Sequence, residues 1–322
     1  MKVVCYDPFS RRDDLGPAIA AFPSIDFVRP SSLAELAASL ADAEALVIGN
    51  RAYDEEAART IRQNGASLRW IQFTTSGIDK ATTFGLPPGV VVTNAAGLRA
   101  FSVAEHALAL MLALVRNLRA TDQGQRDNVW CRDVVTPRMD NLAGKHLVVI
   151  GVGSIGQEIA RKAKAFDMVV TGVSRSTQPL EHFDVVRPRE QLREAVAAAD
   201  MLVMAATYEA QTHEMLNRAL IDAMKPTAYF INIGRGQLVE EPALVDALRE
   251  NRIAGAGLDV TMVEPLPAQH PLYNLGNVIV TPHIAGAGST GTGAGMSKIL
   301  ADNLALWLKG EKLQKIVIEK TE

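Results

Sequence analysis

The chain has 322 residues, of which 48% are hydrophobic and 21% are charged, with a formal net charge of −3. This length suggests about two domains, and the composition is typical of a globular protein in water. The small negative charge gives no general attraction for nucleic acid or for an anionic membrane, so we expect neither as a partner.

The two cysteines and the amino terminus indicate in which cellular compartment the protein is expected. Cys5 and Cys131 form neither a CxxC motif nor a metal-ligand spacing, so we expect reduced thiols and no metal site. The longest apolar run, Ala107–Val115, is far shorter than the ~20 residues of a membrane span. Asp7 interrupts the amino terminus before a signal-peptide core could form. The sequence therefore predicts a cytoplasmic protein.

In the first hundred residues, short runs of β-branched and apolar residues alternate with helical patterns, which predicts an α/β fold with a parallel sheet. Strands are expected at Lys2–Tyr6, Ala45–Ile48, Arg69–Phe73 and Val90–Thr93. Helices are expected at Ser32–Leu40, which Ser32 and Glu35 open as a capping box, and at Asp54–Gln63.

A long apolar helix is then expected to bridge into a second unit. It would begin at Ser102, with Glu105 completing a second capping box, and end at about Arg119. Six more strands are expected at His146–Ile150, Met168–Val173, Met201–Ala205, Tyr229–Ile233, Ala254–Val260 and Val278–Thr281. With helices between them, they predict a doubly wound sheet. A glycine-dense stretch at 286–295 and a last helix at about Met296–Lys309 complete the chain.

The segment 151–156 reads GVGSIG and stands between a predicted strand and a predicted helix. That context favours a dinucleotide site over a purely structural glycine turn. Gly151 would allow the tight turn, Gly153 the approach of a pyrophosphate, and Gly156 close packing of helix on strand. Ser154 and Ile155 open the helix, whose N-terminal N–H groups attract phosphate, so we expect both to contact the cofactor as well.

The end of the next strand bears on which nucleotide binds. An NAD site usually places an acid there, but no acid occurs from Met168 to Leu180. Ser174 stands at the usual acidic position, followed by Arg175 and Ser176. A guanidinium can pair with a 2′-phosphate, so NADP is the expected cofactor and NAD remains possible. In the alternative, Arg175 stacks on the adenine of NAD or points into solvent.

Three polar residues follow later strands of the same predicted sheet. Arg235, Glu264 and His283 each come after the carboxyl end of a strand, at the edge where ligands bind in open α/β sheets. Arg235 could hold a carboxylate and polarise a carbonyl, and His283 could transfer a proton near neutral pH. Glu264 could orient the imidazole and stabilise its charged form. Each residue alone could be an ordinary loop residue; their joint position predicts hydride chemistry on a small 2-oxo or 2-hydroxy acid.

These segments closely resemble the D-isomer-specific 2-hydroxyacid dehydrogenases. The matching motifs are GVGSIGQEIARKAKAF from Gly151, INIGRG from Ile231, GLDV from Gly257, EPLP from Glu264, TPHIAG from Thr281, VAEH from Val103 and SGID from Ser76. The Ser174-Arg175-Ser176 pattern is similar to that of the NADPH-dependent glyoxylate/hydroxypyruvate reductases of the family. The resemblance implies catalytic roles for Arg235, Glu264 and His283.

The resemblance also implies a topology and a substrate site. A substrate-binding domain would comprise residues 1–99 and 285–322, and a dinucleotide-binding domain, residues 100–284, would be inserted into it; both would be Rossmann-like or flavodoxin-like. The substrate carboxylate would rest on the N–H groups of Ser76 and Gly77, and a homodimer would form through an arm around Trp130. Arg51 is a further candidate for substrate binding. Cofactor contacts are also expected at Val103, Ala206, Ile233 and Asp259.

Two alternatives stay open. One is an NAD-dependent D-hydroxyacid or phosphoglycerate dehydrogenase, although a phosphorylated substrate would need more cations than Arg51 in the first domain. The other is a dinucleotide-sensing protein like the corepressors of this fold, which would be expected to carry partner-binding tails. One departure from the family pattern stands near the expected nucleotide: Thr207-Tyr208-Glu209-Ala210 replaces the usual Pro-Leu-Thr-Pro.

Overall fold

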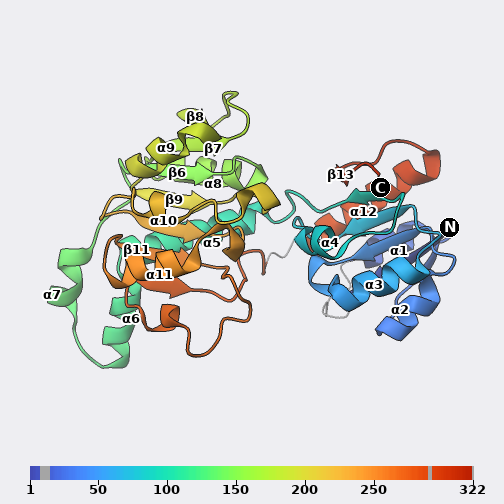
Figure 1. Cartoon of the computed structure of the whole chain (residues 1–322), viewed down its shortest axis with the longest axis horizontal. Coiled ribbons are helices and arrows are strands. Elements are labelled where there is room, and N and C mark those ends of the chain that lie inside the picture. The colour runs from blue at the N-terminus through green and yellow to red at the C-terminus, as the bar shows by residue number, and fades with distance from the viewer. Residues whose placement is uncertain (8–14, 289–291, 321–322) are drawn as a thin grey trace. The chain divides into compact units, whose positions relative to one another are not determined.

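The computed structural model describes residues 1–7, 15–288 and 292–320. The chain divides into two compact units, Met1–Arg99 with Ser289–Glu322, and Ala100–Gly288 (Figure 1). Each unit is built on a largely or wholly parallel sheet, which confirms the predicted fold class.

The first unit has a six-stranded sheet in the order β13-β5-β4-β3-β1-β2. Its strands are β1 (Lys2–Tyr6), β2 (Asp26–Val28), β3 (Ala45–Ile48), β4 (Trp70–Phe73), β5 (Val91–Thr93) and β13 (Ile316–Ile318). Its helices are α1 (Gly16–Ala21), α2 (Leu33–Leu40), α3 (Glu55–Asn64), α4 (Asp79–Phe84) and α12 (Thr292–Lys309). All pairs are parallel except β13 with β5, so the order of the parallel strands is that of flavodoxin-like sheets.

Successive residues of the first unit's strands enter different cores, as the period of two in a strand requires. Val4 of β1 packs in the core under α2 and α3, whereas Val3 and Cys5 pack in the core under α1 and α12. The sheet is thus covered by helices on both faces, and near-continuous apolar strands are the consequence.

Two details of the helix caps differ from expectation. Ser32 caps α2 by accepting a hydrogen bond from the N–H of Glu35 at 3.3 Å, but the Glu35 carboxylate accepts from the N–H and hydroxyl of Ser31, not from Ser32. The predicted cap at Ser102 is wrong, because α5 (Ala100–Val115) begins two residues earlier and places Ser102 inside the helix.

The second unit has a seven-stranded parallel sheet in the order β12-β11-β10-β9-β6-β7-β8. Its strands are β6 (His146–Ile150), β7 (Val169–Ser174), β8 (Val185–Pro188), β9 (Met201–Met204), β10 (Tyr229–Asn232), β11 (Gly255–Leu258) and β12 (Val278–Val280). Its helices are α5, α6 (Leu118–Arg126), α7 (Arg132–Val135), α8 (Ser154–Lys164), α9 (Leu192–Ala198), α10 (Arg218–Ile221) and α11 (Glu241–Arg249). This order extends the doubly wound dinucleotide-binding sheet by one strand.

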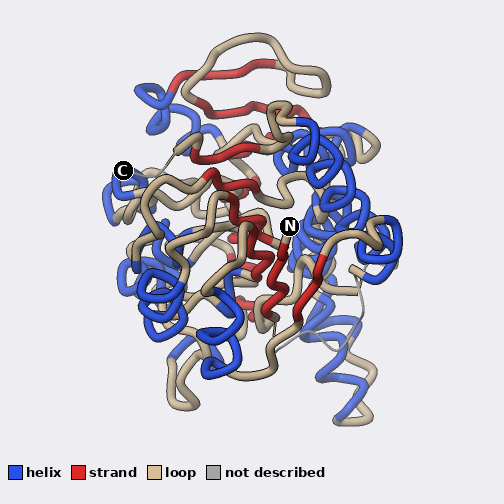
Figure 2. Tube along the Cα trace, turned by 90° about the vertical axis from the view of Figure 1, so that its right-hand side faces the viewer, coloured by secondary structure: helices blue, strands red, loops and turns tan. Residues whose placement is uncertain are grey.

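The strands of the second unit also divide their side chains between two cores. Val149 packs with α5 and α8 on one face, and Val148 packs with α9 and α11 on the other. Figure 2 shows the strands running between helices on both sides. Burial on both faces fixes the register of each strand, because a shift of a strand by one residue would move its side chains from one core to the other.

The predicted bridging helix is broken. α5 ends at Val115, Asn117 adopts a left-handed backbone with φ 50°, and α6 continues at an angle of 68°. Within the described parts of the chain, no single helix is both long and apolar enough to cross a membrane, although α5 and α6 together pass that test by length and composition.

The glycine-dense stretch after His283 has no single structure. Gly286 and Gly288 precede the gap in the description, and Gly291 lies outside the described residues. Gly293 and Gly295 belong to α12, which begins at Thr292 and not at Met296 as predicted. The stretch therefore contributes to a helix, and its sequence did not reveal how far that helix extends.

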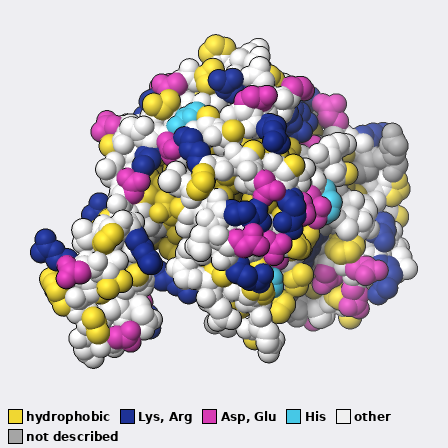
Figure 3. Space-filling view, turned by 60° about the vertical axis from the view of Figure 1, so that its left-hand side comes forward, with side chains coloured by type: hydrophobic (Ala, Val, Ile, Leu, Met, Phe, Trp, Pro, Cys, Tyr) yellow, Lys and Arg dark blue, Asp and Glu magenta, His cyan; other side chains and the backbone are white. Residues whose placement is uncertain are grey.

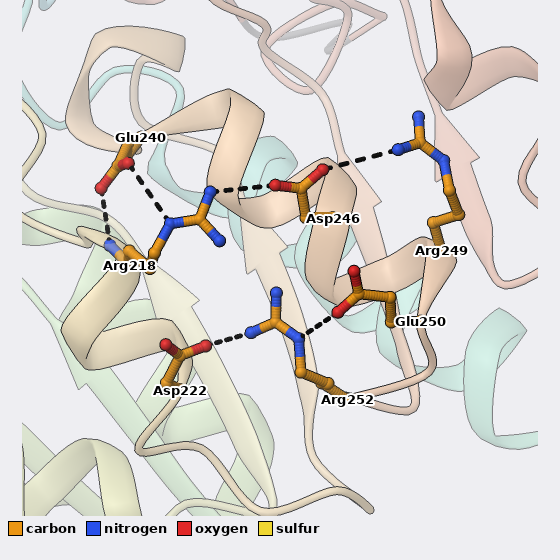
Figure 4. Close-up of polar contacts among 7 residues, drawn as sticks. All are labelled: Arg218, Asp222, Glu240, Asp246, Arg249, Glu250 and Arg252. Atoms are coloured by element: carbon orange, nitrogen blue, oxygen red, sulfur yellow. Dashed lines mark hydrogen bonds and ion pairs between the residues drawn. The ribbon is translucent and has the colours of Figure 1, made fainter.

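A network of ion pairs joins α10, α11 and the turn that leads into β11 (Figure 4). Arg218 lies 2.9 Å from Asp246, and Arg252 pairs with Asp222 and with Glu250. Figure 3 likewise shows basic and acidic side chains interleaved on the face that it draws. Because the guanidinium groups of the network are paired with carboxylates, we regard it as a structural feature of this surface.

Candidate active site

The glycine-rich loop lies between β6 and α8, at the point where the order of the strands reverses. β6 pairs with β7 on one side and with β9 on the other. In open α/β sheets, dinucleotides bind at this point, beyond the carboxyl ends of the strands. Gly153 is the N-cap of α8, and both Gly153 and Ser154 are exposed. The first N–H groups of α8 are thus turned to a place where an anion can bind.

Each glycine of the loop meets a different constraint. Gly151 has φ 98°, and a Cβ there would lie 2.7 Å from the backbone of Ala205 and Ala206. A Cβ at Gly156 would overlap the carbonyl oxygen of Gly151. A Cβ at Gly153 would meet nothing within 4 Å. The loop is closely packed at Gly151 and Gly156 and has open space at Gly153. A pyrophosphate could approach the backbone at Gly153, so the residues present fit a dinucleotide.

The turn after β7 carries the residues expected near the adenosine ribose. Ser174 ends the strand, and its hydroxyl accepts a hydrogen bond from the N–H of Ser176 at 3.4 Å. Arg175 is exposed, and its guanidinium lies 3.8 Å from the carboxylate of Glu209. Glu209 belongs to the Thr207–Ala210 segment after β9, so an acid does reach this turn, although none follows β7 in the sequence.

Arg235 stands on a tight turn after β10. The side chain of Asn232 donates to the carbonyl of Arg235 at 3.0 Å and accepts from the N–H of Gly234 at 3.1 Å, which fixes the turn. A Cβ at Gly236 would overlap the backbone of Thr261, so the turn packs directly on the loop after β11. The guanidinium of Arg235 donates to the carbonyl of Gly234 at 2.8 Å.

His283 and Glu264 form an ion pair. Nδ1 of His283 lies 2.7 Å from Oε2 of Glu264, whose other oxygen accepts from the N–H of Thr261 at 3.2 Å. His283 has φ 54°, and its N–H donates to the carbonyl of Asp259 at 2.8 Å. Since a carboxylate only accepts, Nδ1 carries the hydrogen in this arrangement.

The environment of Glu264 favours its charged form. Burial raises the pKa of the carboxyl, but the hydrogen bond and charge of His283, the N–H of Thr261 and the charge of Arg235 together hold the pKa below its ordinary value. The positive charge of Arg235 thus favours the charged form of this carboxylate. The three side chains after β10, β11 and β12 therefore form one electrostatic cluster.

A buried carboxylate supports the loop that carries His283. Asp259 is 2% exposed, and its two oxygens accept from the N–H groups of Ile284 and Ala285, both at 2.9 Å. The hydroxyl of Thr281 donates to Asp259 at 2.6 Å, and Nε2 of His106 lies 2.9 Å from that hydroxyl. Because the proton of Thr281 goes to the carboxylate, His106 is the donor to Thr281.

The sequence did not reveal this network. Asp259 was expected to contact the cofactor, which stays a prediction, and His106 and Thr281 had no expected role. One signal was available: an acid directly after a fully apolar strand must find buried donors, and His106 is one of the few polar residues of a largely apolar helix.

Three more expected cofactor contacts lie in the core of the second unit. Val103 in α5, Ala206 after β9 and Ile233 after β10 are all buried. Their contacts with a cofactor remain predictions. Within the described parts of the chain, no group of three or more His, Cys, Asp or Glu side chains could hold a metal ion.

Ser76, Gly77 and Arg51 belong to the first unit. The carbonyl of Ser76 accepts from Asn94 at 2.7 Å, and that of Gly77 accepts from the hydroxyl of Thr75 at 2.9 Å. Among the described residues, none accepts a hydrogen bond from the N–H of Ser76 or of Gly77. Arg51 is exposed and belongs to a short 3₁₀ helix, Asn50–Ala52. This helix lies beside the turn, because the N–H of Asn50 donates to the hydroxyl of Thr75 at 3.2 Å. The turn therefore offers two backbone donors to a ligand.

Comparison with known proteins adds to this geometry. The chain is 36% identical to a glyoxylate reductase from Thermococcus gammatolerans over 228 aligned residues. The aligned region covers 69% of this chain and 68% of that protein. A D-isomer specific 2-hydroxyacid dehydrogenase family protein from Aeromonas salmonicida has a similar structure, with a TM-score of 0.86 at 26% identity and 98% coverage of both chains.

A second solved structure is an NADPH-dependent glyoxylate/hydroxypyruvate reductase from Sinorhizobium meliloti in complex with NADP and malonate. The TM-score is 0.79 at 27% identity, over 99% of this chain and 97% of that one. Residues 108–285, more than half of the chain, match the family described as D-isomer specific 2-hydroxyacid dehydrogenase, NAD binding domain. The chain therefore belongs to the D-isomer specific 2-hydroxyacid dehydrogenase family and is an NAD(P)-dependent oxidoreductase that acts on a CH–OH group.

Proposed function

We propose that the protein reduces a short 2-oxo acid, such as glyoxylate or hydroxypyruvate, to the corresponding 2-hydroxy acid. The observation that carries this proposal is the hydrogen-bonded pair of His283 and Glu264, on the sheet edge that also holds the glycine loop and Arg235. The names of the similar glyoxylate and hydroxypyruvate reductases support the choice of substrate.

The proposed chemistry gives each side chain one task. The bound nicotinamide would supply the hydride to C2 of the oxo acid. Arg235 would hold the carboxylate and polarise the C2 carbonyl through its two-pronged guanidinium. Nε2 of His283 would donate a proton to the oxygen of C2, while Nδ1 stays hydrogen-bonded to Glu264. The charged Glu264 would orient the imidazole and stabilise its protonated form.

The carboxylate of the substrate would also use the first unit. The N–H groups of Ser76 and Gly77 would act as donors to this anion, and Arg51 would add positive charge nearby. We propose that the first unit, residues 1–99 and 289–322, binds the substrate and that the second unit, residues 100–288, binds the dinucleotide. An Arg235→Lys variant tests the clamp, since lysine keeps the charge and loses the two parallel hydrogen bonds.

NADPH is the proposed coenzyme. The turn of Ser174, Arg175 and Ser176 offers a guanidinium and two hydroxyls to a 2′-phosphate. Arg175→Ala should therefore weaken NADPH binding by roughly 10- to 150-fold and leave NADH almost unchanged, as expected for a hydrogen bond to a charged group. A wild-type chain that prefers NADH would contradict this choice and leave the dehydrogenase assignment intact.

The deciding experiment for the substrate is a panel of 2-oxo acids assayed with NADPH and NADH in parallel. We expect the highest kcat/KM for glyoxylate or hydroxypyruvate. Pocket discrimination of ~10- to 200-fold per methylene group would let larger acids react more slowly. A preference for a phosphorylated acid with NAD would favour a phosphoglycerate dehydrogenase in place of the proposed reductase.

We further propose a cytoplasmic homodimer. Val129, Trp130 and Val134 are exposed on and before α7, and Trp130 is 90% exposed. Such an apolar patch is typical of an interface between subunits. Neither Cys5 nor Cys131 forms a disulfide in the described parts of the chain, which fits a reducing compartment. Trp130→Ala should convert the dimer into a monomer in sedimentation velocity.

A further inference from the structure

Glu209 lies beside the turn after β7 that is expected to hold the 2′ position of the coenzyme. Its carboxylate lies 3.8 Å from the guanidinium of Arg175. We propose that Glu209 determines coenzyme specificity by competing with a 2′-phosphate for Arg175 and by offering an acceptor to a 2′-hydroxyl. This inference rests on the proposed dinucleotide site and deepens it.

The positions of the two residues in the sheet support this role. Arg175 follows β7 and Glu209 follows β9, and these strands are the two neighbours of β6. The glycine loop begins at the carboxyl end of β6. Arg175 and Glu209 thus approach each other across the crevice in which doubly wound sheets bind the adenosine half of a dinucleotide.

Glu209 is held in place by its own loop. It is the N-cap of a 3₁₀ helix, Ala210–Thr212; its carbonyl accepts from the N–H of Thr212 at 2.9 Å, and its N–H donates to the hydroxyl of Thr212 at 2.8 Å. Thr212 is fully buried, and its hydroxyl also donates to the loop. The contacts with Thr212 therefore hold the backbone of Glu209 at the place from which its carboxylate reaches Arg175.

Arg175 has fewer constraints than Glu209. Its side chain is 73% exposed, and Glu209 is 38% exposed, so the pair is screened by water and is weak. A 2′-phosphate can therefore take the guanidinium from Glu209, but it must do so beside a negative charge that stays fixed. The result is a smaller advantage for NADPH than the turn after β7 alone would give.

The same carboxylate can serve NADH. In NAD sites an acid at the end of the second strand accepts a hydrogen bond from the ribose 2′-hydroxyl, and Ser174 stands at that position here. Glu209 supplies an acid at this place from a different loop. The chain should therefore accept both coenzymes, with the balance set by Arg175 on one side and Glu209 on the other.

Glu209→Gln is the variant that tests this inference. Glutamine keeps the size of the side chain and the backbone contacts with Thr212 and removes the charge, so the thermal unfolding midpoint should change little. Kd values for NADPH, NADH and adenosine 2′,5′-bisphosphate would be measured by titration calorimetry, so the readout does not depend on turnover. The matched control is Glu250→Gln, which makes the same change of charge beside the start of β11.

We expect Glu209→Gln to tighten NADPH and the bisphosphate by about two- to tenfold, the range for removal of one exposed like charge and one weak ion pair. NADH should bind equally well or more weakly, and Glu250→Gln should leave all three constants unchanged. An unchanged ratio of the NADPH and NADH constants in Glu209→Gln would overturn the inference. Arg175→Ala separates the two proposals, because it tests the 2′-phosphate site without altering Glu209.

Discussion

Nδ1 of His283 lies 2.7 Å from Oε2 of Glu264, although the two residues stand on different loops and are 19 positions apart in the chain. The backbone of His283 is left-handed, with φ 54°, and the imidazole depends on that conformation to face the carboxylate. Position 283 therefore needs both an imidazole that pairs with Glu264 and a residue that tolerates a left-handed backbone. Mutations can separate these two requirements.

His283→Asn and His283→Ala form an informative pair. Asparagine tolerates a left-handed backbone far better than alanine, so His283→Asn should fold like the wild type while Ala carries additional strain. Both should lower kcat by about 10²- to 10⁴-fold, because both remove the proton donor. Steady-state kinetics and thermal unfolding measure the two effects. A kcat within a few-fold of wild type in His283→Asn would remove His283 from the proposed chemistry.

Glu264 should make the stability depend on pH. Its pKa in the folded chain is below the ordinary value of 4.5, so its contribution is complete above pH 4.5 and is lost as the pH falls through the lower folded pKa. The difference in unfolding free energy between wild type and Glu264→Gln should thus be larger at pH 6 than at pH 3. Urea titrations at the two pH values test this.

The same titrations in a His283→Asn background serve as the control. His283 lowers the pKa of Glu264 more than any other group does. The pH dependence contributed by Glu264 should therefore shrink when the imidazole is absent. An equal pH dependence in both backgrounds would show that the ion pair does not contribute to it.

Asp259→Asn should disturb the loop that carries His283. One oxygen of Asp259 would become an NH2 group, which would face the N–H of Ile284 or of Ala285. An unsatisfied buried donor costs about 1–3 kcal/mol, so both stability and kcat should fall. Thr281→Val is the milder comparison, since it removes one hydroxyl and keeps the two backbone contacts. If Asp259→Asn lowered stability without changing kcat, the network would not position His283.

The fold could be predicted from the sequence where strands are fully buried. β9 is wholly apolar and β6 and β10 are apolar except for one terminal residue each, and their predicted bounds differ from the observed ones by at most one residue. The sequence did not reveal β2, β8, β13 or α1. β8 reads Val-Val-Arg-Pro and β2 begins with Asp26, and such short edge strands keep polar residues and proline.

The site could be predicted only as far as the sheet edge determines it. The positions of Arg235, Glu264 and His283 after their strands follow from the alternation of strands and helices. The contact of Arg175 with Glu209 depends on the order of the strands β7, β6 and β9, and on the contacts between the backbone of Glu209 and Thr212. The role of Asp259 depends on which donors the buried carboxylate meets. Neither the contact of Arg175 with Glu209 nor the hydrogen bonds of Asp259 correspond to a residue spacing that can be recognised in the sequence.

Gly153→Ala and Gly151→Ala should separate cofactor binding from folding. A Cβ at Gly153 meets nothing within 4 Å, and its φ is −68°, which alanine adopts without strain. Gly153→Ala should therefore keep the unfolding midpoint of the wild type and weaken both NADPH and NADH, because the methyl group would occupy the place proposed for the pyrophosphate.

Gly151→Ala should behave in the opposite way. Its φ of 98° and the 2.7 Å approach to Ala205 and Ala206 leave no place for a side chain, so the loop must shift and stability must fall. Thermal unfolding without coenzyme, followed by calorimetric titration with NADPH, would measure both effects in both variants. Unweakened binding of both coenzymes by Gly153→Ala would mean that the pyrophosphate does not lie against this glycine, and the proposed position of the dinucleotide on α8 would have to be abandoned.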